Sequence, residues 1–134
     1  MEVGLYGKLP SHGDFLRRRV SDAFVDAWDA WLREGLTASR AALGERWLNV
    51  YLTSPAWRFV CGPGACGPAP VLGLMAPSVD RVGRYFPLTV VVELPPETTL
   101  VSLPEEAREF FDNTERDLKR NVIRDALSRL SANP

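Results

Sequence analysis

The sequence predicts a single α+β domain over residues 1–134, with a mostly antiparallel central sheet of about four or five strands and helices on both faces. The predicted elements run in the order of one strand, two helices, three strands and a last helix. Strands in close succession favour antiparallel pairing, and helices before and after the run favour cover on both faces. A chain of 134 residues is long enough for one domain with its own core.

The first strand is predicted within residues 2–9. Val3 and Leu5 alternate there with small or polar residues, which is typical of a strand, and Pro10 ends the pattern. Residues 13–19 are expected to form one helical turn that begins near an acidic residue, because a carboxylate suits the exposed amides of a helix start.

The clearest predicted helix begins after Ser21, a favourable N-cap, and ends at Gly44. Its apolar residues recur at helical spacing, and we expect its tryptophans to lie in the core, with an exposed anchor for a partner as the alternative. A shorter helix is predicted over residues 45–53, before Pro55 breaks it. The apolar stripe of the first helix consists of Phe24, Trp28, Trp31, Leu32 and Leu36.

Three further strands are predicted at residues 56–61, 71–76 and 85–94 from their branched and aromatic residues. The consecutive valines 90–92 indicate a strand that is covered on both faces.

The last segment is predicted to be helical from about Pro104, with glutamates in its first turn. Because it is long for one globular helix, we expect a break near Asn121. Its apolar stripe consists of Ala107, Phe110, Phe111, Thr114 and Leu118, and it resumes through Val122, Ile123, Leu127 and Leu130.

Composition excludes several classes of protein. The formal net charge is −1, so no overall field favours nucleic acid or an anionic membrane, and no apolar run is long enough to span a bilayer. The start of the chain does not have the pattern of a signal peptide. Cys61 and Cys66 lack the spacing of a zinc site, and we expect free thiols in a reducing cytoplasm.

The only histidine, His12, follows Ser11 and precedes Asp14, which together are the residue types of a hydrolytic triad. In a triad the histidine lies between the nucleophile and the carboxylate in space, which residues so close in sequence rarely achieve. The sequence also lacks the Gly-x-Ser-x-Gly elbow of many hydrolases. We therefore expect no catalytic residue here, and a histidine in a turn.

Neither phosphate-binding glycine pattern is present, since Lys8 directly follows Gly7 and no Gly-x-Gly-x-x-Gly occurs. No cofactor or metal is expected. The second polar cluster lies in the segment PSVDRVGR, where Asp80 is expected either to take part in a functional site or to cap a turn. The polar residues of this cluster are Ser78, Asp80, Arg81 and Arg84.

Three segments together resemble the TagF family of type VI secretion-associated proteins. They are GKLPSHGDFLRR at residues 7–18, YLTSPAWRF at residues 51–59 and PSVDRVGRYFPLTV at residues 77–90. They occur in the family's order and are specific as a combination. The chain is thus interpreted as a single TagF-like domain over residues 1–134.

The resemblance implies a cytoplasmic bacterial protein, not an enzyme, that represses the assembly or activity of the type VI secretion machine after translation. It implies a forkhead-associated scaffold protein as the partner, with no nucleic acid and no membrane insertion. An alternative from another class is a small-ligand or nucleotide-sensing regulatory module that uses the two loops as opposed walls.

We expect the loops around His12 and Asp80 to meet at one end of the sheet and to bind the partner. An internal ion pair between Asp14 and Arg84 is expected to order them, while Lys8 and Arg81 face outward. The candidate partner-binding residues are Lys8, His12, Asp14, Asp80, Arg81 and Arg84.

Overall fold

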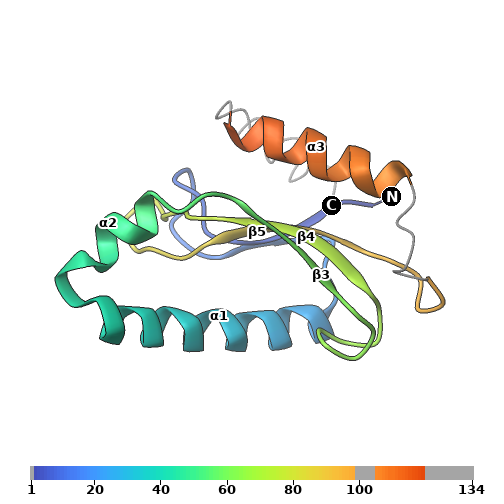
Figure 1. The fold of residues 1–134 in the computed structure, drawn as a ribbon, viewed down its shortest axis with the longest axis horizontal. Helices are drawn as coiled ribbons and strands as arrows, with labels where there is room; N and C mark the ends of the chain where they lie inside the picture. Colours follow the sequence, from blue (N-terminus) through green and yellow to red (C-terminus); the bar gives the residue numbers. More distant parts are fainter. Residues whose placement is uncertain (1, 99–104, 120–134) are drawn as a thin grey trace.

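The computed structural model describes residues 2–98 and 105–119 and confirms the predicted α+β fold (Figure 1). Its five strands form one antiparallel sheet in the order β2-β1-β5-β4-β3. The strands are β1 (Gly4–Gly7), β2 (Leu16–Arg18), β3 (Trp57–Cys61), β4 (Val71–Ala76) and β5 (Leu88–Glu93). The helices are α1 (Asp22–Leu43), the 3-10 turn η1 (Gly44–Arg46), α2 (Trp47–Leu52) and α3 (Glu105–Lys119).

Helices α1 and α3 cover opposite faces of the sheet (Figure 1). Successive side chains of a strand point to opposite faces, and β5 uses both. Val91 packs in the core beneath α1, whereas Val90 and Val92 pack in a second core with Phe110 of α3. All three valines are buried, which confirms that this strand is covered on both sides.

Helix α1 has the predicted ends. The Ser21 hydroxyl accepts a hydrogen bond from the Phe24 amide at 3.1 Å, and Gly44 ends the helix with a φ of 54°. Trp28 is buried, as predicted, but Trp31 is 56% exposed, so its assignment to the core was wrong. Three residues turn an α-helix by about 300°, which displaces Trp31 toward the edge of the apolar stripe, where it stacks on Trp28.

Two other local predictions need correction. Residues 13–19 form no helical turn, because Leu16–Arg18 adds strand β2 to the free edge of β1, where its backbone groups find partners. The helix predicted over residues 45–53 is split, since Gly44–Arg46 forms a 3-10 turn before α2.

Helix α3 begins at Glu105, close to the predicted start, and is tied to β3 by an ion pair between Arg58 and Asp112 at 3.1 Å. The break expected near Asn121 and the second half of the apolar stripe lie outside the described residues. In the described part of the chain, no helix combines the length and the apolar character that a membrane crossing requires.

Cys61 and Cys66 are free thiols whose sulfur atoms lie 3.0 Å apart, at the end of β3 and in the loop that follows. Burial, together with the neighbouring Cys66, raises the pKa of the Cys61 thiol to about 12. The Cys61 thiol is therefore protonated at neutral pH, which makes it a poor nucleophile.

Candidate functional site

The two polar loops of the sequence meet in space, as predicted. We call residues 8–14 and 78–84 the paired loops. The first leaves the end of β1 and the second leads into β5, and these strands are neighbours in the sheet. The Arg81 amide donates to the His12 carbonyl at 2.8 Å, and the Ser78 hydroxyl donates to the Lys8 carbonyl at 2.6 Å.

Gly7 allows this close approach at the end of β1. Its φ is 143°, a conformation that favours glycine. A Cβ atom at this position would lie 2.2 Å from the Pro87 carbonyl oxygen, far inside van der Waals contact. The absence of a side chain at Gly7 thus lets the end of β1 lie directly against the backbone at the start of β5.

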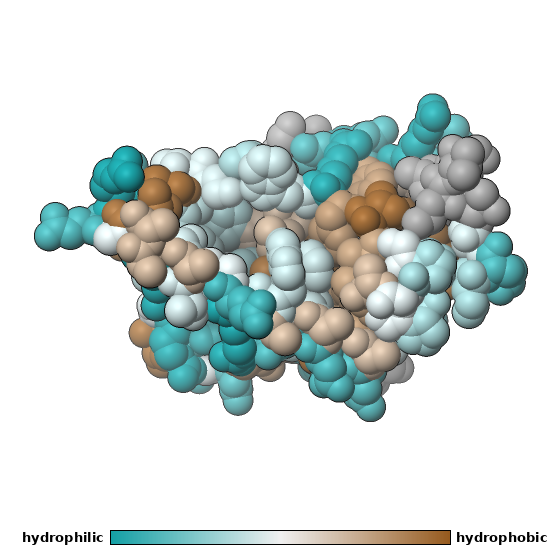
Figure 2. Space-filling model, turned by 60° about the horizontal axis from the view of Figure 1, so that its bottom comes forward, coloured by the Kyte–Doolittle hydropathy of each residue, from teal (hydrophilic) through white to brown (hydrophobic). Residues whose placement is uncertain are grey.

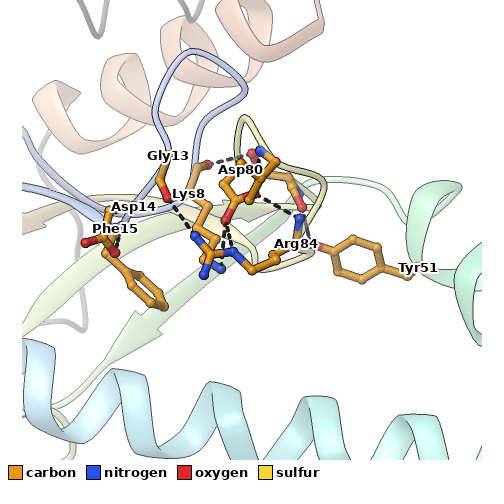
Figure 3. A network of polar contacts seen from close by, with 9 residues as sticks. Lys8, Gly13, Asp14, Phe15, Tyr51, Asp80 and Arg84 are labelled. Carbon is orange, nitrogen blue, oxygen red and sulfur yellow. Dashed lines mark hydrogen bonds and ion pairs between the residues drawn. The ribbon is translucent and has the colours of Figure 1, made fainter.

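The Asp80 carboxylate joins the paired loops (Figure 3). Its Oδ2 atom accepts from Lys8 Nζ at 3.1 Å and from Arg84 Nε at 2.7 Å. Its Oδ1 atom accepts from the backbone amides of Val82 at 3.0 Å and Arg84 at 2.9 Å, so the carboxylate also caps the turn. The side chain itself is fully enclosed.

The surroundings keep Asp80 ionised. Burial alone would raise the pKa of the carboxyl, but hydrogen bonds from the Arg84 amide, from Lys8 and from the Arg84 side chain outweigh burial. The pKa of Asp80 is therefore held well below its usual range. At neutral pH the group is a fixed anion between two cations.

The internal ion pair is not the one we expected. Arg84 binds Asp80, and its Nη2 donates to the Gly13 carbonyl at 2.6 Å, while Asp14 accepts from the Phe15 amide at 2.7 Å (Figure 3). The predicted pair between Asp14 and Arg84 was therefore wrong. Arg84 is four residues from Asp80, and the turn that the carboxylate caps brings the two side chains together.

Lys8, which we expected to face outward, is only 7% exposed. Its ammonium group lies against Asp80 and 4.9 Å from the centre of the Phe15 ring. A lysine directly after a strand end is normally solvated, so the sequence carried no signal for this burial.

His12 is half-buried, and its Nδ1 atom lies 2.8 Å from the Ser11 hydroxyl. The Asp14 carboxylate is used by the Phe15 amide instead of the second ring nitrogen. Within residues 2–98 and 105–119, no three His, Cys, Asp or Glu side chains gather as a metal site would need.

Arg81 faces solvent, as predicted. Its guanidinium lies over Gly13, where an added Cβ would be 3.1 Å from Nη2. In the described part of the chain it is exposed and has no ion pair. Next to it Val82 is 67% exposed, and Asp14 lies at the surface of the other loop. Arg81, Val82 and Asp14 form what we call the outer loop surface.

Sequence reasoning missed the role of Tyr51. Its hydroxyl donates to the Ser78 carbonyl at 2.7 Å and accepts from the Ser78 amide at 2.9 Å, which anchors the second loop to α2. Burial raises the pKa of Tyr51 to about 12. Tyr51 opens the second of the three segments that carry the family resemblance, and that was the available signal.

Comparisons with known proteins place this geometry in context. The family model described as "TagF N-terminal domain, Type VI secretion system-associated" matches residues 4–131. The solved structure of PA0076 from Pseudomonas aeruginosa PAO1 is similar to the chain, at 54% sequence identity and a TM-score of 0.73. That match covers 74% of this chain and 45% of the other, so this chain spans less than half of its relative. No curated protein matches the sequence.

Proposed function

This chain belongs to the TagF N-terminal domain family of type VI secretion-associated proteins, and from this we propose that it is a non-enzymatic repressor of the secretion machine. It acts after translation, in the bacterial cytoplasm, by binding a forkhead-associated scaffold protein. The outer loop surface supplies the contact.

Arg81 is the main contact residue that we propose for this surface. Lys8 and Arg84 are both engaged by Asp80, so their charges are largely used inside the domain. Arg81 is held by its backbone at His12 while its side chain stays exposed. Arginine is among the residues that most often dominate binding energy at protein interfaces. A rigid backbone that presents a free guanidinium suits an acidic surface on the scaffold.

The arrangement around His12 supports a role without catalysis. A hydrolytic histidine needs a carboxylate that orients its ring, and the nearby Asp14 caps the Phe15 amide. The Ser11 hydroxyl contacts His12 at an exposed position. We expect His12→Ala to leave repression intact.

The experiment compares scaffold binding by purified wild-type protein and by Arg81→Glu in a calorimetric titration. Exposed charges contribute little to folding, so the free energy of unfolding should change by no more than about 0.5 kcal/mol. A like-charge clash at an interface is costly and slows association, so scaffold affinity should fall by about tenfold or more. Secretion in cells that express the variant should rise accordingly.

Arg108→Glu is the matched control, since Arg108 is an exposed arginine on α3, across the sheet from α1. It should bind the scaffold like the wild-type protein. Full scaffold affinity in a folded Arg81→Glu protein would exclude the outer loop surface as the contact. Absence of binding by the wild-type protein would exclude the scaffold as the partner.

A further inference from the structure

A cavity of about 490 Å³ lies between α1 and the second of the paired loops. Phe15 and Tyr85 contribute aromatic walls, and Leu36 and Thr37 come from α1. It is distinct from the outer loop surface, because Arg81 is not among the residues that line it. The volume falls within the range of pockets that take small molecules.

The charged residues that line this cavity are all cations: Lys8, Arg33, Arg40 and Arg84. They come from a strand end, one helix and one loop, so only the tertiary fold assembles them. Figure 3 shows Lys8 and Arg84 extending from the paired loops toward the side on which α1 lies. Like charges gathered in this way repel one another, and a bound anion would relieve the repulsion.

Two carboxylates pair with three of the four cations. Asp80 pairs with Lys8 and Arg84, and Asp29 pairs with Arg33 at 2.7 Å. Neither carboxylate lines the cavity. Two carboxylate charges thus offset the charges of three of the lining cations, and the lining retains a positive excess.

Arg40 is the cation that this arrangement leaves uncompensated. Its guanidinium stacks on the Trp47 ring at 4.2 Å, and within the described residues it has no ion pair. Stacking fixes the plane of the guanidinium without using its N–H donors. Arg33 is oriented in a similar way, with its guanidinium 5.3 Å from the centre of the Phe15 ring.

We propose that this cavity binds a small phosphorylated molecule, with Arg40 as a contact to its phosphate group. Arginine donors in a planar fork match phosphate oxygens, and rings that fix the guanidinium reduce the entropy lost on binding. The cavity is far larger than one phosphate ion requires, and its aromatic walls suit an organic portion. This site goes beyond the proposed scaffold contact and is independent of it.

The test is a calorimetric titration of the whole chain with three probes: adenosine monophosphate, pyrophosphate and inorganic phosphate. We expect adenosine monophosphate to bind more tightly than inorganic phosphate, and added salt to weaken each interaction. Arg40→Gln removes one charge-assisted contact and should weaken binding of adenosine monophosphate by about tenfold or more. Arg40→Lys, which keeps the charge without the fork, should bind with intermediate affinity.

Arg46→Gln is the control, because Arg46 is an exposed arginine in the turn after α1 and does not line the cavity. It should bind the probes like the wild-type protein, and circular dichroism verifies that each variant is folded. Equal affinity of wild-type protein and Arg40→Gln for the probes, or no binding of any probe, would overturn the proposal. If inorganic phosphate binds as tightly as adenosine monophosphate, the inference that the ligand has an organic portion is wrong.

The two proposals can be refuted separately. Arg81→Glu should bind adenosine monophosphate normally, because its side chain lies outside the cavity. Loss of scaffold binding in Arg81→Glu together with loss of phosphate binding in Arg40→Gln would support both proposals, whereas a change confined to one variant refutes only the other site.

Discussion

A buried hydrogen bond between Trp28 and Thr89 helps to fasten α1 to the sheet. The indole Nε1 atom donates to the Thr89 hydroxyl at 2.8 Å, and the bond is buried. Thr89 is fully buried and Trp28 is 5% exposed, so water cannot replace either partner. We predict that Trp28→Phe and Thr89→Val destabilise the protein by amounts that are not additive.

The expected loss of stability follows from the polar group that each substitution leaves buried without a partner. Trp28→Phe leaves the Thr89 hydroxyl buried without its donor, and Thr89→Val leaves the indole N–H without its acceptor. A buried polar group without a partner costs about 1–3 kcal/mol, and Trp28→Phe adds a cavity term. In the double variant both groups are gone, so its destabilisation should be smaller than the sum of the single values by about 1–2 kcal/mol.

Urea denaturation followed by circular dichroism measures the four free energies of unfolding, because tryptophan fluorescence would change with the substitution itself. Equal slopes against urea in all four proteins show that the variants expose comparable surface on unfolding. Trp28→Ala removes the whole indole ring from the core and should lower the free energy of unfolding by about 3–5 kcal/mol.

Trp31→Ala is the matched control on the same helix. Trp31 is mostly exposed but stacks on Trp28 with ring centres 4.8 Å apart, so its loss should cost about 1 kcal/mol. Additivity of Trp28→Phe and Thr89→Val within about 0.3 kcal/mol would refute the coupling. Equal costs for Trp28→Ala and Trp31→Ala would refute the assignment of only the first tryptophan to the core.

Three further predictions concern the paired loops and their anchors. Gly7→Ala should destabilise the protein by about 2 kcal/mol or more in urea denaturation, because the new Cβ meets the Pro87 carbonyl; a wild-type value would contradict this geometry. The folded-state pKa of Asp80 is depressed, so its contribution to stability is complete above the unfolded value of about 3.9 and declines as the pH falls below it. Asp80→Asn should therefore lower Tm at neutral pH and make Tm fall less steeply as the pH is lowered. A dependence of Tm on acidic pH equal to that of the wild-type protein would contradict this prediction. The pKa of Tyr51 is raised to about 12, so its contribution is present below the unfolded value of about 10 and is lost as the pH rises toward 12. Tyrosinate absorbance should show that Tyr51→Phe removes a group that titrates near pH 12; loss of a group that titrates near pH 10 instead would show that Tyr51 is accessible.

Apolar side chains are exposed on and near α2. The face that carries α1 shows apolar residues at the surface near its α2 end (Figure 2). Leu48, Val50 and Leu52 on or near α2 are 41%, 45% and 53% exposed. The sequence predicted a short helix here without deciding its burial; α2 is only six residues long, and Trp47 is its one buried residue.

Local patterns in the sequence were sufficient to predict most of the helices and strands. Ser21 and Gly44 delimit α1 because capping depends on residues within one turn of each other. The run Val90–Val92 predicted a strand with two covered faces because alternate side chains of a strand point in opposite directions. The three segments that resemble the TagF family predicted the secretion association, which the family match shows.

The tertiary structure decided which charges are used and which are free. Arg84 lies four residues from Asp80, yet Lys8 reaches the same carboxylate only because β1 pairs with β5. Arg33 and Arg40 face the loops only because α1 packs across the sheet, and neither position differs in sequence pattern from an ordinary solvated arginine. Charge identity is local, but pairing and burial depend on strand order and register. These are set by the cooperative packing of residues far apart in the chain, so the sequence predicted that the two loops meet, whereas the partner of each charge could be read only from the folded protein.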